Sequence, residues 1–171
     1  MKRTTLITMA LACVAGLAAL SAQTKHVDLK DAKGTSVGTA MISPEKGGGV
    51  SIALDLHGLP PGQHALHFHA VPKCDGPDFT SATGHFNPTS KQHGLQNSAG
   101  PHAGDMNNFT VDAKGNAKTT IVNKNVTMGS EANSIYANGG TALMIHAAAD
   151  DMKSDPAGNA GARIGCGTIV K

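Results

Sequence analysis

Short segments of alternating apolar and polar residues, separated by turn-forming residues, restrict the fold of this chain more than any other feature. Turn sequences such as Leu59-Pro60-Pro61-Gly62 lie between them. No strong helical periodicity runs through residues 23–171. The pattern predicts an all-β sandwich or barrel. We expect eight strands: Lys25–Lys30, Val37–Ile42, Gly49–Leu56, Gln63–His69, Phe109–Ala113, Ala117–Val122, Ala142–Ala147 and Ala162–Val170.

The first 22 residues have the pattern of a secretory signal peptide. Lys2 and Arg3 precede a charge-free apolar stretch from Leu6 to Leu20, and small residues then allow cleavage after residue 21 or 22. The stretch is too short and too rich in Ala and Gly for a membrane span. We therefore expect an exported protein, either periplasmic or secreted, whose mature domain covers residues 23–171. Lipid anchoring at Cys13 is a less favoured alternative, because the residues before it match a lipobox poorly.

Removal of the signal leaves a domain of near-neutral charge. Of the 14 basic residues two lie in the signal, so 12 basic and 12 acidic residues remain. Overall charge therefore gives no support to nucleic-acid or membrane-surface binding, and we expect neither partner. The sequence leaves the oligomeric state open between a monomer and a homodimer.

Cys74 and Cys166 are the two cysteines of the mature domain. An even pair in an exported chain favours a disulfide. The alternative is two buried free thiols.

Histidines gather in three places of this chain. It has nine histidines, one tyrosine and no tryptophan. In a strand, side chains alternate between faces, so His67 and His69 share one face and can hold one metal ion. Leu66, Phe68 and His64 then face the core. The strand near His146 behaves alike, with Leu143 and Ile145 on one face and Met144 and His146 on the other. His26 and His57 are expected at the surface.

Two long loops, residues 71–106 and 148–161, interrupt the strands. A compact domain seldom carries so long a loop unless function, a metal ion or a disulfide orders it. The first loop supplies His85, His93, His102 and the carboxylate of Asp105. Three imidazoles and one carboxylate suit a closed tetrahedral zinc site. The strand histidines suit the more open arrangement that copper prefers.

These residues resemble the copper/zinc superoxide dismutase family, particularly its bacterial exported branch. The resemblance covers nearly all of the mature chain. It is carried by four stretches and by His146 followed by Asp150-Asp151. The stretches are His64-Ala65-Leu66-His67-Phe68-His69, Gly84-His85-Phe86-Asn87-Pro88, Gly100-Pro101-His102-Ala103-Gly104-Asp105 and Gly158-Asn159-Ala160-Gly161-Ala162-Arg163-Ile164-Gly165-Cys166-Gly167.

The resemblance implies an eight-stranded antiparallel Greek-key barrel of immunoglobulin-like type with two long functional loops. It also implies one copper and one zinc ion per subunit, with the imidazolate of His85 shared between them. The implied copper ligands are His67, His69, His85 and His146. The implied zinc ligands are His85, His93, His102 and Asp105.

The implied activity is disproportionation of superoxide to oxygen and hydrogen peroxide, with copper alternating between two oxidation states. His85 would take and deliver a proton, and Arg163 would attract and orient the anion. Asp150 would hydrogen-bond one histidine of each metal site and fix its orientation. Cys74 and Cys166 match the family disulfide.

The chain departs from the family pattern at several non-ligand positions. Ala65 replaces the usual Gly, Ala70 stands where an acid is common, and Ala147-Ala148-Ala149 replaces a segment that often carries charge. These changes bear on substrate steering, which Lys73 or Lys153 would have to supply instead. Two rival functions are a copper carrier on the same fold, which predicts metal binding without dismutation, and a plain β-sandwich binding module, which predicts no stoichiometric metal.

Overall fold

The computed structural model describes residues 24–171, and the expected signal peptide and Cys13 lie outside them. Two short 3₁₀ turns, Thr80–Ala82 and Ala137–Gly139, interrupt the loops. No helix in residues 24–171 has the length and apolar character needed to span a membrane. The strands are β1 Lys25–Lys30, β2 Ser36–Pro44, β3 Val50–Leu56, β4 Gly62–His64, β5 Leu66–His69, β6 Phe109–Val111, β7 Ala117–Asn123, β8 Thr141–His146 and β9 Arg163–Ile169.

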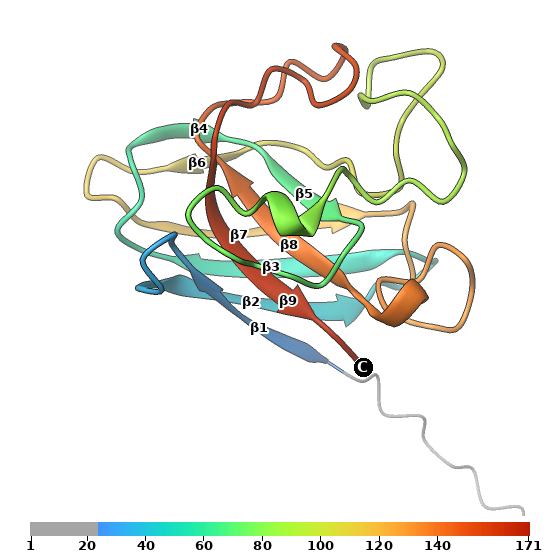
Figure 1. Cartoon of the computed structure of the whole chain (residues 1–171), viewed down its shortest axis with the longest axis horizontal. Helices are drawn as coiled ribbons and strands as arrows, with labels where there is room; N and C mark the ends of the chain where they lie inside the picture. Colours follow the sequence, from blue (N-terminus) through green and yellow to red (C-terminus); the bar gives the residue numbers. More distant parts are fainter. Residues whose placement is uncertain (1–23) are drawn as a thin grey trace, which may run out of the picture.

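The strands form one curled antiparallel sheet and a short two-stranded one (Figure 1). The large sheet has the order β5-β8-β9-β1-β2-β3-β7, and the small sheet pairs β4 with β6. This arrangement confirms the predicted all-β Greek-key barrel. The predicted strand ends agree with the observed ones to within two residues.

One predicted strand, Gln63–His69, is divided in the structure. The division falls at Ala65, because β4 pairs with β6 whereas β5 pairs with β8. The Ala65 N–H donates to the carbonyl oxygen of Ala148 (2.9 Å), and the Ala65 carbonyl oxygen accepts from the N–H of His146 (3.0 Å). The strand therefore changes partner at this residue, which the alternation of side chains does not reveal.

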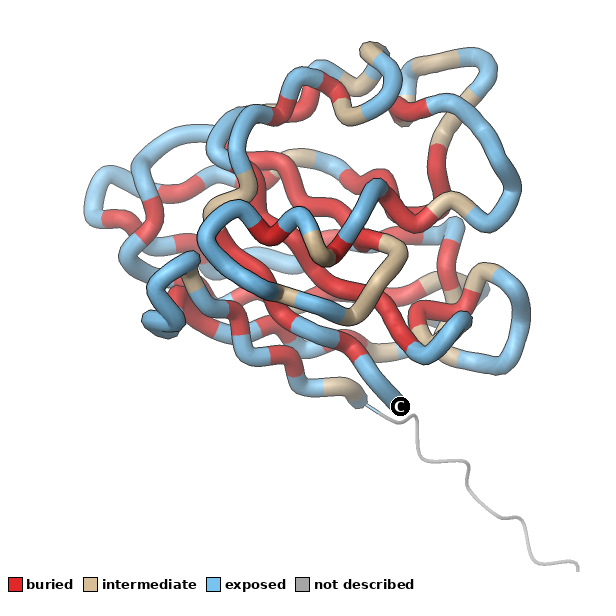
Figure 2. Tube along the Cα trace, viewed as in Figure 1, coloured by how far each residue is buried: buried red, intermediate tan, exposed pale blue. Residues whose placement is uncertain are grey.

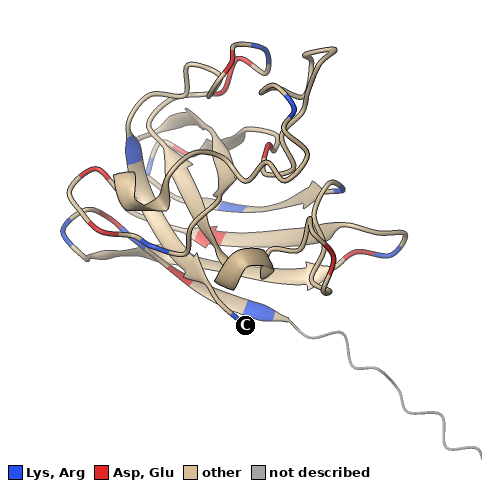
Figure 3. Cartoon of the chain, turned by 45° about the vertical axis from the view of Figure 1, so that its right-hand side comes forward, with Lys and Arg blue, Asp and Glu red and all other residues tan. Residues whose placement is uncertain are grey.

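A single main core fills the space enclosed by the two sheets. Inward residues of β3, such as Ile52 and Leu54, pack with Leu66 and Phe68 of β5 and with Phe109 of β6. Burial follows the strands and also reaches into the long loops (Figure 2). Charged residues of both signs are interspersed along loops and strand edges (Figure 3). His26 and His57 are exposed, as predicted.

A second, smaller core lies on the other face of β8. It contains Phe79, Ala142, Met144 and Cys166, with Cys74 packed against it. Cys74 and Cys166 form a disulfide across a sequence separation of 92 residues. The disulfide therefore ties the beginning of the first long loop to β9.

Candidate metal centre

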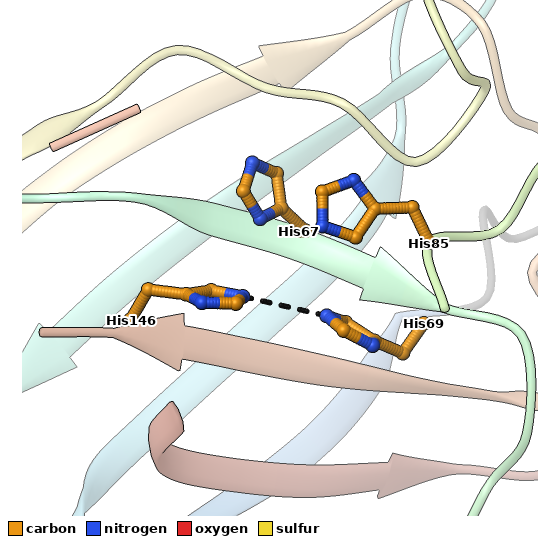
Figure 4. Close-up of side chains that lie close together, drawn as sticks. All are labelled: His67, His69, His85 and His146. Atoms are coloured by element: carbon orange, nitrogen blue, oxygen red, sulfur yellow. Dashed lines mark hydrogen bonds between the residues drawn. The ribbon is translucent and has the colours of Figure 1, made fainter. Parts of the chain in front are cut away.

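The strand alternation places three histidines on one face of the large sheet. In β5, Leu66 and Phe68 enter the main core, so His67 and His69 project from the opposite face. β8 lies beside β5, and His146 at its end projects to the same side (Figure 4). All three rings are buried. The predicted assignment of faces is confirmed.

The first long loop brings a fourth histidine to this face because it pairs with β5. The Phe86 N–H donates to the Phe68 carbonyl oxygen (2.8 Å), and the Phe68 N–H donates to the Gly104 carbonyl oxygen (3.0 Å). This close approach requires glycine at position 104, because a Cβ there would collide with the Phe68 carbonyl oxygen. His85, next to Phe86, is thus held over His67 and His69 (Figure 4).

Four imidazoles form the first donor group. One nitrogen of each of three rings donates outward: His67 Nε2 to Asp150 Oδ2 (2.7 Å), His69 Nδ1 to the Thr83 carbonyl (2.8 Å) and His146 Nδ1 to the Gly161 carbonyl (3.3 Å). The other nitrogens point inward. The inward donor atoms of His67, His69, His85 and His146 all lie within 4.8 Å of one another.

The inward nitrogens of this group fit a metal ion. His67 Nδ1 and His85 Nε2 are buried and have no hydrogen-bond partner within residues 24–171. A buried polar atom without a partner costs about 1–3 kcal/mol, so such pairs are rare unless a ligand or ion fills the gap. His69 Nε2 and His146 Nε2 lie only 3.4 Å apart (Figure 4). A cation that accepts lone pairs from all four rings would satisfy them together.

The second donor group consists of three imidazoles around one carboxylate. Asp105 Oδ1 lies 3.0 Å from His85 Nδ1, 3.0 Å from His93 Nδ1 and 3.4 Å from His102 Nδ1. Asp105 Oδ2 accepts the backbone N–H groups of Gly94 (2.8 Å) and His102 (2.9 Å). The carboxylate is therefore fixed in place by the backbone, and the donor set is the one typical of closed zinc sites.

His85 belongs to both groups. Its Nδ1 faces Asp105 and its Nε2 faces the strand histidines. His85 is the only residue that these two four-donor groups share, so its ring can contact an ion held in each of them; a third, three-residue set, His67, His93 and Asp150, joins the groups through the outer nitrogens.

Asp150 links the two groups from behind. Its carboxylate accepts hydrogen bonds from His67 Nε2 (2.7 Å) and from His93 Nε2 (3.0 Å). Asn108 holds the Asp150 backbone, with Oδ1 accepting its N–H (2.9 Å) and Nδ2 donating to its carbonyl oxygen (2.9 Å). One histidine of each group is thus oriented by a single fixed carboxylate.

Burial keeps the first group electrically neutral. It lowers the pKa of His69 to about 2 and the pKa values of His85 and His146 to about 4, and neighbouring imidazoles add to the effect. Burial also lowers the pKa of His67. These rings therefore carry free lone pairs at neutral pH, as metal ligands must.

The second group is strongly polarised. Burial lowers the pKa of His93, but hydrogen bonds to Asp105 and Asp150 outweigh burial and raise that pKa to about 9. Burial raises the pKa of Asp105, but hydrogen bonds from His102, His85 and His93 hold it far below its usual range. In the absence of a metal ion, a proton on His93 thus balances the negative charge of the carboxylates. A bound metal cation would take over that role.

Arg163 stands beside the first group and is held by loop carbonyls. Its Nη1 donates to the Phe79 carbonyl oxygen (2.7 Å) and its Nη2 to the Thr83 carbonyl oxygen (2.6 Å). The Thr83 carbonyl also accepts from His69. One backbone oxygen thus positions both a histidine and the guanidinium, and the Cys74–Cys166 disulfide anchors the segment that carries it.

Sequence reasoning did not identify several supporting residues. Thr83 and Asn108 act through backbone or amide contacts that only the folded chain creates. His64 was predicted to face the core and is buried, with Nδ1 2.7 Å from the His146 carbonyl oxygen and Nε2 2.8 Å from the Pro60 carbonyl oxygen. For Asn108 the sequence offers one weak signal, its position three residues after Asp105.

Comparisons with known proteins agree on one family. The family model described as "Copper/zinc superoxide dismutase (SODC)" matches residues 36–169. The protein named superoxide dismutase [Cu-Zn] 1 of Aquifex aeolicus is 50% identical over 146 residues, which cover 84% of this chain and 86% of that relative.

Solved structures show the same likeness. A double mutant of a superoxide dismutase-like protein from Bacillus subtilis superposes with a TM-score of 0.83 at 37% identity, covering 85% of this chain and 97% of that one. The Cu/Zn superoxide dismutase of Brucella abortus gives a TM-score of 0.72 at 28% identity, covering 86% and 99%. With its two donor groups and its fold, the chain belongs to the copper/zinc superoxide dismutase family.

Proposed function

We propose that this protein disproportionates superoxide to oxygen and hydrogen peroxide, with one copper and one zinc ion per subunit. The observation that carries the proposal is the position of His85, whose two ring nitrogens face two different donor groups. We assign copper to His67, His69, His85 and His146. We assign zinc to His85, His93, His102 and Asp105.

Copper supplies the one-electron chemistry when bound, whereas zinc has no redox chemistry of its own. The protein supplies the proton and the geometry. His85 Nε2, which is buried and has no hydrogen-bond partner in the described part of the chain, is the atom at which a proton is held and released. Nδ1 of the same ring faces Asp105, and zinc held by both residues would fix the ring, so that the proton would return to the same atom.

Arg163 attracts and orients the anion. Its guanidinium is fixed by hydrogen bonds to two carbonyl oxygens. Among the described residues, no acidic side chain makes a hydrogen bond to it. A fixed, unpaired cation in a partly buried site focuses an incoming anion more strongly than an exposed one.

The proposal is tested by measuring metal content and dismutation in the same preparation. We expect about one copper and one zinc per chain together with rapid dismutation. A copper carrier would bind copper and fail to dismutate superoxide, and a plain binding module would hold no stoichiometric metal. Either result would overturn the proposal.

The role of Arg163 has a separate test. Arg163→Ala is expected to lower kcat/KM and to weaken its dependence on ionic strength, because the local attraction for the anion is lost. The matched control is Lys118→Ala, which removes a positive charge from β7, the edge strand opposite β5, where Lys118 pairs with Asp55 of β3. Equal kinetics in both variants would remove Arg163 from the mechanism.

We also propose export to the periplasm with removal of residues 1–22. N-terminal sequencing of the protein from the periplasmic fraction should begin at residue 22 or 23. A chain that begins at Cys13 and carries lipid would instead support anchoring. Sedimentation equilibrium of the mature protein decides between a monomer and a homodimer.

A further inference from the structure

We call the second donor group (His85, His93, His102 and Asp105) the zinc side and the first (His67, His69, His85 and His146) the copper side. Each zinc-side histidine has one ring nitrogen that faces Asp105 and one that faces away. For His85 the second nitrogen faces the copper-side group, and for His93 it donates to Asp150 (3.0 Å). His102 directs Nδ1 toward Asp105, so its Nε2 is the outer nitrogen. The acidic atom facing that nitrogen is Asp155 Oδ1, at 3.9 Å.

The same oxygen of Asp155 contacts a second zinc-side residue. Asp155 Oδ1 accepts the backbone N–H of His93 at 2.6 Å. A single carboxylate oxygen thus contacts the backbone of one histidine and faces the ring of another. The two histidines lie nine residues apart in the first long loop, whereas Asp155 lies in the second.

The position of Asp155 is fixed by close packing between the two long loops. Gln96 N–H donates to the Met152 carbonyl oxygen (2.9 Å), and Asn97 Nδ2 donates to the Lys153 carbonyl oxygen (3.3 Å). Gly94 has a φ of +111°, and a Cβ there would collide with the Met152 carbonyl oxygen. The loops lie side by side at the top of Figure 1.

We propose that Asp155 is a positioning residue for zinc, acting through His93 and His102; the inference rests on the proposed function. A carboxylate behind a metal-bound imidazole fixes the ring and increases its basicity. The side chain of Asp155 is 49% exposed, so solvent screens its charge. The hydrogen bond to the His93 backbone is therefore the larger part of its effect, and the interaction with the His102 ring is the smaller.

Zinc affinity measured by chelator competition on copper-free protein tests this role. Asp155→Ala loses both contacts and should bind zinc about 10–100-fold more weakly. Asp155→Asn keeps an oxygen that accepts the His93 N–H but loses the negative charge, so its affinity should fall between those of the wild type and the Ala variant. The copper affinity of zinc-free protein should stay within about twofold of the wild type, because the Asp155 carboxylate contacts His93 and His102, which are not among the four copper-side histidines.

Asp151→Ala is the matched control. Asp151 is an exposed acid of the same loop that accepts hydrogen bonds from Lys153, Ser154 and Asn159 and contacts no zinc-side residue. The Asp151→Ala substitution therefore disturbs the loop but leaves the Asp155 contacts with His93 and His102 in place. Cobalt bound in place of zinc gives visible absorption bands that report donor geometry, and these should shift in Asp155→Ala but not in the control.

Three results would overturn the inference: a zinc affinity of Asp155→Ala within about threefold of the wild type, equal weakening in Asp151→Ala, or an unchanged cobalt spectrum. The outcome is separable from the proposed function. A wild-type protein that fails to bind zinc contradicts the proposed function. A wild type that binds zinc, with Asp155 variants that bind it equally well, contradicts only the role of Asp155.

Discussion

The Cys74–Cys166 disulfide provides the sharpest test of how this fold is stabilised. We consider replacement of both cysteines by Ala. The bond closes a loop with a sequence separation of 92 residues. On the chain-entropy argument, a loop of this length lowers the entropy of the unfolded chain enough to contribute about 4–5 kcal/mol at 25 °C. Cys166 is buried, so its truncation adds a small packing loss.

Urea unfolding of metal-free protein measures this contribution. The double variant should lose about 4–5 kcal/mol of the free energy of unfolding relative to the oxidised wild type. The matched control is the wild type with its disulfide reduced, which keeps both side chains and should lose nearly the same amount. A loss below about 1 kcal/mol in both samples would refute the chain-entropy reasoning for this fold.

The same perturbation has a functional consequence. The disulfide anchors the segment whose Phe79 and Thr83 carbonyls hold the Arg163 guanidinium. Without the bond, Arg163 should lose its fixed position, and kcat/KM should fall toward the value of Arg163→Ala. Adding Arg163→Ala to the double variant should then cause little further loss. A full additional loss would show that the guanidinium does not depend on the disulfide.

Three further predictions concern single residues. His64→Leu removes the ring that contacts the buried His146 carbonyl oxygen, so the free energy of unfolding should fall by about 1–3 kcal/mol in urea melts, and an unchanged free energy of unfolding would contradict this. Thr83 has φ 61° and ψ −149°, a region that favours Gly; Thr83→Gly should therefore raise the melting temperature, whereas Thr83→Ala should not. Asp150→Asn should weaken both zinc and copper binding in chelator titrations, because its carboxylate orients one histidine of each group; an effect on one metal alone would contradict the linked orientation.

Much of the fold could be predicted because strand alternation is a local property. The period of two residues assigns Leu66 and Phe68 to the core and His67 and His69 to the opposite face without knowledge of the rest of the chain. Turn residues locate the strand ends almost as well. The division at Ala65 escaped prediction because it depends on the change of partner from β6 to β8, which is a long-range event.

The candidate donor side chains could be read from local patterns alone: the alternating strand histidines and the loop residues between His85 and Asp105. Which ring nitrogen faces which donor group depends on long-range contacts, because the tautomer and the orientation of a ring are set by the partner of its opposite nitrogen. The same long-range packing brings Asp150 to the rings of His67 and His93, and Asp155 to the His93 backbone and the His102 ring. These contacts join residues of two loops that have no regular local pattern in the sequence. Their conformation is set by strand pairing, by the disulfide and by the packing of one loop on the other.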